Sequence, residues 1–406
     1  MRQRSRLRQG LRTAQAAALA LVAFAATAVA DGGLPHVARI AYPNDIEGSL
    51  VQAIVSLRET GLQHALDEID NVVARKPNFR LAYLVQGDML MARAGHPVAF
   101  ASNAATAATV APLQDEARVR LKRYLDAPPV DYLPAPLLKL ARDQSHVLLV
   151  DTSRSRLFVY ANDLGRPRYV TDFYVSLGKE GVEKAREGDG KTPIGVYTVI
   201  GTKDKLPDFY GVGAYPLSYP NDWDRLHGRS GHGIWLHGTP SNTYSRAPWA
   251  TDGCIVLTNE DFAKLGKYVD VTRTPVVIGE KVRWLDAQKW EAERASFQSA
   301  LESWRSDWES RDVERYLSHY SDQFRSERLD APAWKARKRK VDSNKTWIKV
   351  KLDDVSFYEY PGSPGTMMVT FSQDYRSNNL SRRVTKRQFW VREGHTWRIV
   401  HESVLS

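Results

Sequence analysis

Cys254 is the one cysteine in this chain of 406 residues. A lone thiol is a leftover, a crosslinker between molecules or a nucleophile, and its neighbours decide which. A thiol attacks as the thiolate, and an ordinary cysteine with a pKa of about 8.5 is mostly protonated at neutral pH. His237 lies upstream, and an imidazole can accept that proton and return it to a leaving amine. On these two residues alone, a buried cysteine beside a hydrogen-bonded core histidine is the alternative.

Glycines flank the cysteine and the histidine in two short motifs, His237-Gly238-Thr239 and Thr251-Asp252-Gly253-Cys254. A glycine lets the backbone approach a substrate closely. The amide N–H groups of a Gly-Cys turn can face the oxyanion that forms when a thiolate attacks a carbonyl. Gly253 and Gly238 are therefore candidates for backbone contacts during acyl transfer.

Two further blocks support this interpretation: the stretch GDGKTPIGVY at residues 188–197 and the stretch AYPLSYPN at residues 214–221. With the two motifs above, they resemble the L,D-transpeptidase (YkuD-type) catalytic domain. The resemblance implies that Cys254 is the nucleophile, that His237 is the general base, and that peptidoglycan stem peptides are the substrate. It implies no cofactor and no metal. The residues from which we expect substrate contacts are Tyr219, Arg246, Thr251 and Asp252.

Asp252 departs from the family pattern, which has a histidine before the Gly-Cys pair. A carboxylate beside a thiolate raises the pKa of the cysteine unless it turns away or pairs with a cation. Arg246, in the intervening loop, can serve as that cation or bind a substrate carboxylate. A solvated loop arginine with neither role is an equally good interpretation.

Three histidines in the loop region, His227, His232 and His237, recur every five residues. With Cys254 or Asp252 they could imitate a metal site. A spacing of five residues puts the histidine side chains on a common face of neither a helix nor a strand, so it gives no reason for them to converge on one metal ion. Because the family resemblance also implies no metal, we expect no metal site here.

The catalytic residues must be positioned by residues 145–282, where the sequence period changes to that of strands. Short runs rich in β-branched and aromatic residues alternate with polar turns, which is typical of antiparallel hairpins. These runs are 146–150, 156–160, 168–176 and 194–200. A long loop-rich stretch at 203–252 follows, and the domain closes near 276–279. We therefore predict a mostly-β L,D-transpeptidase domain with long functional loops.

Residues 31–140 are predicted to be helical. One helix opens at 61–66 and ends near Pro77, and the next covers 79–94. Aligning Ala65 with the small residue of a tetratricopeptide helix puts the following residues on repeat signature positions: Pro77, Tyr83, Gly87 and Leu90. A plain helical hairpin is an equally good interpretation. The prolines at 128–129 and in the stretch 133–136 then indicate a linker.

Residues 285–406 show an α+β pattern, helices followed by a run of strands. One face of a long helix is formed by Trp290, Phe297, Leu301, Trp304 and Trp308, and a second helix is predicted to carry Val313, Tyr316, Leu317 and Tyr320. Strands are predicted at 347–358, 366–375, 384–392 and 396–402, after a basic patch at 335–340. The region resembles nuclear transport factor two, a cone-like fold. The L,D-transpeptidase subgroup with such a domain is known for L,D-carboxypeptidase trimming as well as transpeptidation.

The first thirty residues read as a secretory signal peptide, with an arginine-rich start, an apolar stretch at 14–29 and the cleavage pattern Ala28-Val29-Ala30. A retained membrane anchor is the alternative, although the apolar run is shorter than the roughly 20 residues a span needs. We expect cleavage, a periplasmic location and no membrane span thereafter. The predicted division of the multidomain chain is therefore 1–30, 31–140, 145–282 and 285–406.

The formal charge of +10, from 57 Lys+Arg against 47 Asp+Glu, first suggests a nucleic-acid binder. Five of the arginines lie in the signal peptide, which contains no acid, so 52 bases against 47 acids leave +5. That excess lies mainly in residues 285–406, which suits a weak hold on an anionic wall or partner better than nucleic acid. A solvated surface is an equally good explanation.

The sequence thus predicts an exported L,D-transpeptidase that acts on stem tetrapeptides through a cysteine thioester, in cell-wall biogenesis and cell shape. The first alternative is an L,D-carboxypeptidase that trims tetrapeptides to tripeptides. The second is a non-catalytic wall-binding scaffold, which Asp252 favours and the intact His237 and Cys254 pair opposes. The helical or the C-terminal domain is a candidate site for a cell-wall protein partner.

Overall fold

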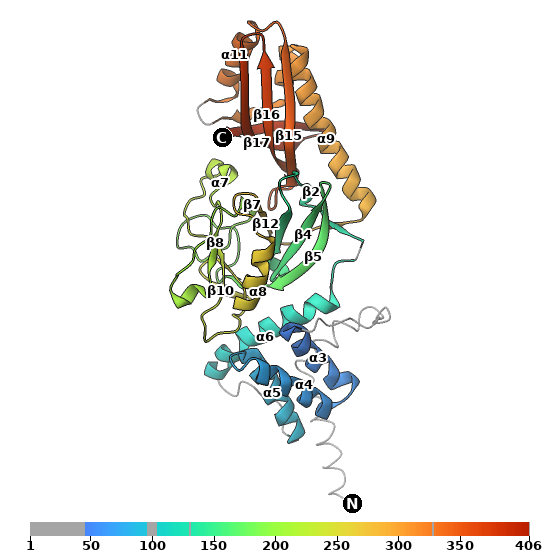
Figure 1. Ribbon diagram of the computed structural model, residues 1–406, viewed down its shortest axis with the longest axis vertical. Coiled ribbons are helices and arrows are strands. Elements are labelled where there is room, and N and C mark those ends of the chain that lie inside the picture. Colours follow the sequence, from blue (N-terminus) through green and yellow to red (C-terminus); the bar gives the residue numbers. More distant parts are fainter. Residues whose placement is uncertain (1–44, 96–103, 130, 327–328, 406) are drawn as a thin grey trace, which may run out of the picture. The chain divides into compact units, whose positions relative to one another are not determined.

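The computed structural model describes residues 45–95, 104–129, 131–326 and 329–405, and the predicted signal peptide lies outside them. The chain forms two compact units (Figure 1). Unit 1 contains the N-terminal helices together with two loops, Pro207–Gly211 and Thr239–Ala250. Unit 2 contains the rest of the chain from Pro128 onward. Within the described ranges, no helix is both long enough and apolar enough to cross a bilayer.

Unit 1 is built on helices whose apolar faces meet in a shared core. The helices are α3 (Ile46–Glu59), α4 (Leu62–Arg75), α5 (Arg80–Arg93) and α6 (Ala104–Leu125). The core includes Leu50, Leu66, Ile69, Val72, Leu81 and Val85. Asp45 is the N-cap residue of α3, and its carboxylate accepts a hydrogen bond from the Gly48 N–H at 2.7 Å. This side-chain cap satisfies one of the N–H groups that the first turn leaves open.

The helical prediction is confirmed for the parts of this region that the structure describes up to Leu125, and the α4–α5 pair is a helical hairpin with Pro77 in its turn. Its tetratricopeptide character stays a prediction. Ala65 is buried, whereas Tyr83 and Leu90 are 45% and 40% exposed. The buried positions of α5 are instead Leu81, Ala82, Val85 and Met89.

The catalytic region of unit 2 is β-rich, as predicted, and contains a five-stranded sheet in the order β5-β4-β3-β12-β7. These strands are β3 (His146–Asp151), β4 (Arg156–Asp163), β5 (Arg166–Tyr174), β7 (Gly195–Thr198) and β12 (Pro275–Gly279). Strands β3, β4 and β5 form antiparallel hairpins, and β12 runs parallel to β3. The central strands β3 and β12 are almost wholly buried, as expected for strands covered on both faces.

A smaller sheet in the order β11-β9-β8 carries the candidate catalytic motifs. Its strands are β8 (Ala214–Pro216), β9 (Trp235–His237) and β11 (Ile255–Val256). The remaining short elements of the region are η1 (Thr152–Arg154), β6 (Leu177–Gly178), η2 (Asp208–Tyr210), α7 (Asp222–Leu226), β10 (Trp249–Thr251), α8 (Asn259–Leu265), η3 (Gly266–Tyr268) and β13 (Trp284–Leu285). The predicted loop-rich stretch at 203–252 is thus mostly irregular backbone broken by short strands and turns.

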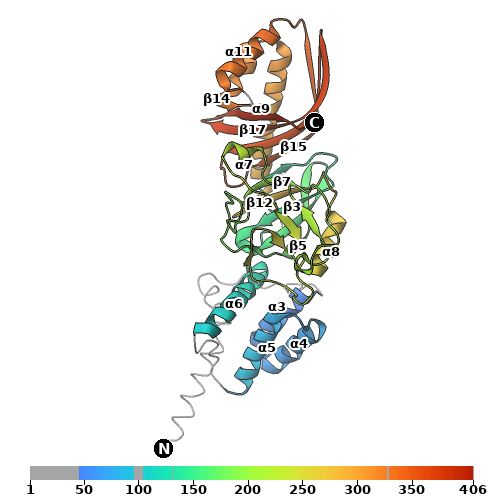
Figure 2. The same ribbon diagram turned by 90° about the vertical axis from the view of Figure 1, so that its left-hand side faces the viewer.

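The C-terminal region of unit 2 is an α+β domain, as predicted. Its sheet has the order β14-β18-β17-β16-β15-β2, and α9 lies along it (Figures 1 and 2). The elements are α9 (Ala287–Ser310), α10 (Val313–Ser318), β14 (Tyr320–Arg325), α11 (Ala331–Asp342), β15 (Ile348–Glu359), β16 (Thr366–Ser377), β17 (Leu380–Glu393) and β18 (Thr396–Val404). The apolar face predicted for the long helix is buried at all five of its positions.

Three details of this region differ from the sequence prediction. Tyr320 begins strand β14 instead of extending the second helix, and its ring packs in a tilted arrangement against that of Trp334, with centroids 4.1 Å apart. The basic patch at 335–340 lies on helix α11, where Ala331 and Trp334 are the buried residues. Part of the predicted linker forms β1 (Leu133–Pro134), which pairs with β13, and the neighbouring β2 (Leu137–Lys139) pairs with β15. The apolar side chains of Leu137 and Leu138 explain this pairing, because both are fully buried.

The catalytic and C-terminal regions share an apolar core and a set of polar contacts within unit 2. Trp223 of α7 stacks on Phe389 of β17 with ring centroids 5.0 Å apart. Asp222 accepts a hydrogen bond from Ser403 at 2.7 Å and pairs with Arg387 at 3.3 Å. The C-terminal sheet therefore holds α7, an element of the catalytic region.

Candidate active site

The two motifs that carry His237 and Cys254 are brought together by the small sheet. Strand β11 pairs in parallel with β9, with Ile255 opposite Leu236 and Val256 opposite His237. The Leu257 N–H also donates to the His237 carbonyl oxygen at 2.9 Å. Cys254 immediately precedes β11, and His237 ends β9. Parallel pairing therefore brings the end of β9, which carries the histidine, beside β11, which the cysteine directly precedes.

His237 is buried, at 1% exposure, and one of its two ring nitrogens makes a hydrogen bond to the backbone. Its Nδ1 lies 2.7 Å from the Gly238 carbonyl oxygen. A carbonyl oxygen only accepts hydrogen bonds, so Nδ1 carries the proton of the neutral ring. The other nitrogen, Nε2, then holds the lone pair that a general base needs. The backbone of the His-Gly motif thus selects the tautomer.

Cys254 is partly exposed, and its Sγ lies 3.4 Å from the Gly233 carbonyl oxygen, to which the thiol donates. A hydrogen bond to a carbonyl favours the protonated thiol, because a thiolate has no proton to donate. A base is therefore needed to generate the nucleophile, and the tautomer of His237 suits that task.

The turn before Cys254 requires glycine. Gly253 has a φ of 119°, a conformation that side chains rarely adopt, and a Cβ there would lie 2.5 Å from the Lys191 carbonyl oxygen. The Thr251 hydroxyl closes the turn, because it accepts from the Gly253 N–H at 3.1 Å and donates to the Cys254 carbonyl oxygen at 2.7 Å. Thr251 thus shapes the turn, and the N–H of Gly253 is engaged in it. An oxyanion role for Gly253 stays a prediction. It requires the Gly253 N–H to exchange its hydrogen bond with Thr251 for one with the oxyanion.

Thr192 supports the same turn from the GDGKTPIGVY block. It is fully buried, and its hydroxyl donates to the Gly253 carbonyl oxygen at 3.1 Å and accepts from the Gly178 N–H at 2.9 Å. Asp189 shapes the preceding loop, where its carboxylate pairs with Lys184 at 2.7 Å. Partial burial alone would raise the pKa of Asp189, but Lys184 and three backbone N–H donors hold it below its ordinary value. The sequence block was recognised, although these two positioning roles were not.

Gly238, the other glycine predicted to make backbone contacts during acyl transfer, also has neighbours that leave no room for a side chain. A Cβ at this position would lie 2.1 Å from Oδ1 of Asn259, the first residue of α8. The same Oδ1 accepts from the Val212 N–H at 3.2 Å. The Gly238 N–H donates to the Gly213 carbonyl oxygen at 3.4 Å. A substrate contact from Gly238 therefore stays a prediction, and the closeness of Asn259 accounts for the glycine.

Asp252 points toward solvent, with its side chain 77% exposed, and pairs with Lys179 Nζ at 2.8 Å. The hydrogen bond and the charge of Asp252 raise the pKa of Lys179. A nearby cation offsets the effect that a carboxylate has on the pKa of a neighbouring thiol, and Lys179 supplies that cation. Arg246, one cation considered from the sequence, has its guanidinium 4.6 Å from the ring centre of Phe209, and its pairing with Asp252 or with substrate stays a prediction. Lys179 lies outside the recognised motifs, so no spacing pointed to it.

Tyr219, predicted to contact substrate, lies in the core of the catalytic region at 6% exposure. Its hydroxyl donates to the Ser230 carbonyl oxygen at 2.9 Å, and burial raises the pKa of this hydroxyl. The residue thus ties together the two ends of the segment 219–230. A substrate role for Tyr219 stays a prediction.

The three histidines of the loop region have different surroundings. The ring of His227 contacts the Trp223 carbonyl oxygen through Nδ1, and His232 lies 3.5 Å from Glu187. Among the residues that the structure describes, no group of three or more His, Cys, Asp and Glu side chains could hold a metal ion.

Comparison with protein families matches two segments of the chain. Residues 145–278 match the L,D-transpeptidase catalytic domain (YkuD), and residues 296–403 match the Cds6 C-terminal NTF2-like domain. A candidate L,D-transpeptidase, YafK of Escherichia coli (strain K12), is 31% identical over 86 residues, which are 21% of this chain. The match spans 31% of the length of YafK.

Solved structures resemble the chain over a longer stretch. Bd1075 of Bdellovibrio bacteriovorus is 27% identical with a TM-score of 0.60, and the match covers 68% of this chain and 98% of Bd1075. The helical cell shape determining protein Pgp2 of Campylobacter jejuni is 27% identical with a TM-score of 0.56, over 66% of this chain and 95% of Pgp2. The chain therefore carries a catalytic domain of the L,D-transpeptidase (YkuD) family, followed by a C-terminal NTF2-like domain of the Cds6 type.

Proposed function

We propose that the chain is an exported, periplasmic cysteine enzyme that modifies peptidoglycan stem peptides through an acyl-enzyme on Cys254. The observation that carries the proposal is the tautomer of His237. Because Nδ1 donates to the Gly238 carbonyl oxygen, Nε2 holds the lone pair that a base needs. The pairing of β9 with β11, which begins directly after Cys254, supports this role.

In the first half-reaction, His237 accepts the proton of the Cys254 thiol. The thiolate attacks the carbonyl carbon of the diaminopimelate residue of a stem tetrapeptide, and the tetrahedral intermediate collapses to a thioester. The bond to the terminal D-alanine breaks, and the imidazolium returns the proton to the leaving amine. Backbone N–H groups of the turn at Cys254 are the candidates for stabilising the oxyanion.

In the second half-reaction, an acceptor attacks the thioester and regenerates the thiol. We propose an amine acceptor, such as the side-chain amine of another stem, which makes the reaction L,D-transpeptidation and its product a cross-link. The family of the catalytic domain supports this choice.

A second candidate is hydrolysis, in which water releases the stem as a tripeptide. The pairing of the catalytic domain with an NTF2-like domain supports it, because the L,D-transpeptidase subgroup that this architecture resembles trims stem peptides as well as cross-linking them. Pgp2 is named for its effect on cell shape. Trimming that changes the number of available cross-linking sites is one route to such an effect, and we propose a wall-shaping role here.

Incubation of the purified protein with isolated sacculi, followed by mass spectrometry of the released muropeptides, separates these candidates. New cross-linked dimers indicate transfer, and loss of tetrapeptide with gain of tripeptide indicates trimming. A Cys254→Ala variant is the control. If the wild type changes neither product relative to this control, the enzyme proposal is wrong and the wall-binding scaffold gains support.

A further inference from the structure

The segment that joins His237 to Cys254 does not belong to the same compact unit as these two residues. Thr239–Ala250 groups with the N-terminal helices in unit 1, as does the loop Pro207–Gly211. His237 and Cys254 both belong to unit 2. The segment, called here the connecting loop, begins two residues after the proposed base and ends shortly before the proposed nucleophile.

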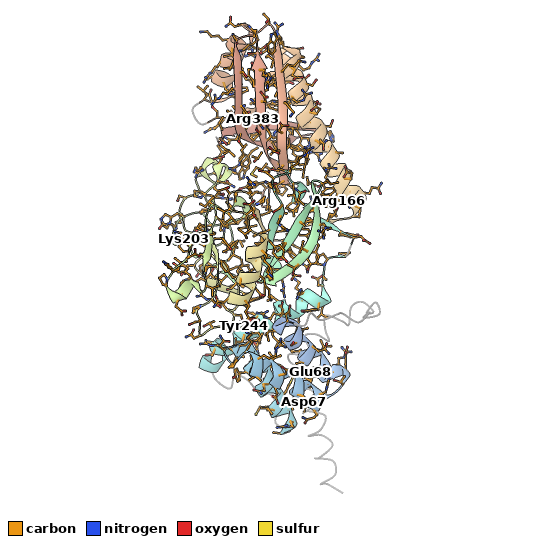
Figure 3. The ribbon with its side chains drawn as sticks, viewed as in Figure 1. Asp67, Glu68, Arg166, Lys203, Tyr244 and Arg383 are labelled. Atoms are coloured by element: carbon orange, nitrogen blue, oxygen red, sulfur yellow. The ribbon has the colours of Figure 1, made fainter. Side chains whose placement is uncertain are left out.

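The first anchor of the connecting loop is Tyr244 (Figure 3). Its ring contacts that of Phe79, which precedes α5, in a tilted arrangement with centroids 4.6 Å apart, and it packs against the core of the helices. Lys76 Nζ lies 5.9 Å from the centre of the same ring. The backbone of Tyr244 also contacts this region, because its N–H donates to the Asn78 carbonyl oxygen at 3.4 Å. Asn78 Nδ2 in turn donates to the Ser241 carbonyl oxygen at 3.4 Å.

The second anchor is a buried ionic network on α3 and α6. Arg120 is 2% exposed and pairs with Glu116 and Glu47, each at 2.9 Å. The Ser245 hydroxyl of the connecting loop donates to Glu116 Oε1 at 2.7 Å. Hydrogen bonds to buried charged groups are among the stronger ones in proteins, and their geometry is specific. The guanidinium of Arg120 also lies 5.4 Å over the ring of Phe79, so the two anchors are joined.

The connecting loop is also braced from within unit 1. Asp208 of η2 accepts from the Ser241 N–H at 3.1 Å, and the Thr239 hydroxyl donates to the Tyr244 carbonyl oxygen at 3.3 Å. Arg246 lies over Phe209 in the same loop pair. Aromatic, ionic and backbone contacts thus fix the connecting loop on the helices at several consecutive positions.

We propose that the N-terminal helices form a socket for the connecting loop and thereby set the geometry of the active site, with Tyr244 and Ser245 as positioning residues. The inference deepens the proposed function and rests on it where substrate turnover is concerned. Tyr244 lies seven residues after His237 and ten residues before Cys254. Each residue of an extended chain spans at most about 3.6 Å, so an anchor at Tyr244 limits the positions that both ends of the connecting loop can reach. A misplacement of about 1 Å can cost about a hundredfold in rate.

The test uses the full-length protein and the substitution Tyr244→Ala, which removes the ring from the socket. The matched control is Tyr83→Ala, the same change at a tyrosine of α5 that is 45% exposed. The conservative variant Tyr244→Phe keeps the ring and is expected to restore the wild-type behaviour. Thermal unfolding of each variant establishes that it is folded.

Three measurements follow. Hydrogen exchange of residues 239–250 should become faster in Tyr244→Ala alone. Alkylation of Cys254 by iodoacetamide, followed against pH, should have a changed profile, because release of the loop frees the backbone that follows His237 and precedes Cys254. With a disaccharide tetrapeptide as substrate, kcat/KM should fall about tenfold or more, mainly through kcat, because the reacting groups are misplaced.

The socket proposal is overturned if Tyr244→Ala leaves the exchange of the loop unchanged, or if the loop loosens while the alkylation profile stays that of the wild type. Alkylation does not depend on turnover of a stem peptide. A wild type that does not act on the tetrapeptide therefore contradicts the proposed function, while the exchange and alkylation data still decide whether the socket sets the site.

Discussion

The turn that carries Cys254 and the connecting loop that precedes it are held in contrasting ways. The turn is fixed by its own region, through the hydroxyls of Thr251 and Thr192 and a backbone contact that leaves no room for a side chain at Gly253. The loop is fixed by helices far away in the sequence, since Ser245 and Glu116 are 129 residues apart. The turn is therefore held within the catalytic domain, whereas the loop that leads into it is held by a region outside the matched family segments.

The largest expected effect comes from Gly253→Ala, which attacks the turn directly. A Cβ would lie 2.5 Å from the Lys191 carbonyl oxygen in a conformation with a φ of 119°. We expect the acylation rate of Cys254 by a carbapenem, followed by intact mass, to fall about a hundredfold or more. Gly201→Ala is the matched control, because no atom outside its chain neighbours lies within 4 Å of a Cβ there. An unchanged acylation rate in Gly253→Ala would contradict the account of the turn.

Thr192→Val is expected to have the next largest effect, because it keeps the shape of the side chain but removes its hydroxyl. The Gly178 N–H loses its acceptor and the Gly253 carbonyl oxygen loses its donor, both in the interior. The loss should lower the free energy of unfolding by about 1–3 kcal/mol, measured by denaturant titration. Thr192→Ser should recover most of it. Hydrogen exchange of the connecting loop should stay that of the wild type, and a loosened loop would show that the helices do not hold the loop by themselves.

Lys179→Met should have the smallest effect, because the pair with Asp252 is exposed to solvent and salt. Without the cation, the Asp252 carboxylate disfavours the neighbouring thiolate and raises the pKa of Cys254. The midpoint of iodoacetamide alkylation should therefore move slightly to higher pH, and the shift should shrink at high salt. Asp252→Asn should move it the other way. A midpoint at lower pH in Lys179→Met would contradict this assignment.

The pattern of the sequence predicted the regular elements because burial follows their period. The apolar stripe from Trp290 to Trp308 and the paired strands from β15 to β18 are examples. Helix α11 was not predicted because most of its residues are charged, and its buried face, formed by Ala331 and Trp334, is too small to give a helical pattern of apolar residues. Strand β14 was missed because Tyr320 continues the helical spacing of α10, although its ring packs against Trp334 of α11.

The candidate site divides in the same way. Cys254, His237 and the glycines beside them are readable from sequence, because acyl transfer and close backbone approach restrict the residue types. Lys179, which pairs with Asp252, carries no such signature, since any cation within reach would serve. The contact between Ser245 and Glu116 arises only when distant segments fold together, so no local pattern encodes it.

The central claim is that His237, with its proton on Nδ1, is the base that activates Cys254. The most direct measurement is the rate at which a carbapenem acylates Cys254, followed against pH in the wild type and in His237→Gln. The account predicts that the variant loses about a hundredfold or more at neutral pH and that its residual rate rises only as the thiol ionises unaided. A variant with the rate and pH profile of the wild type would contradict it.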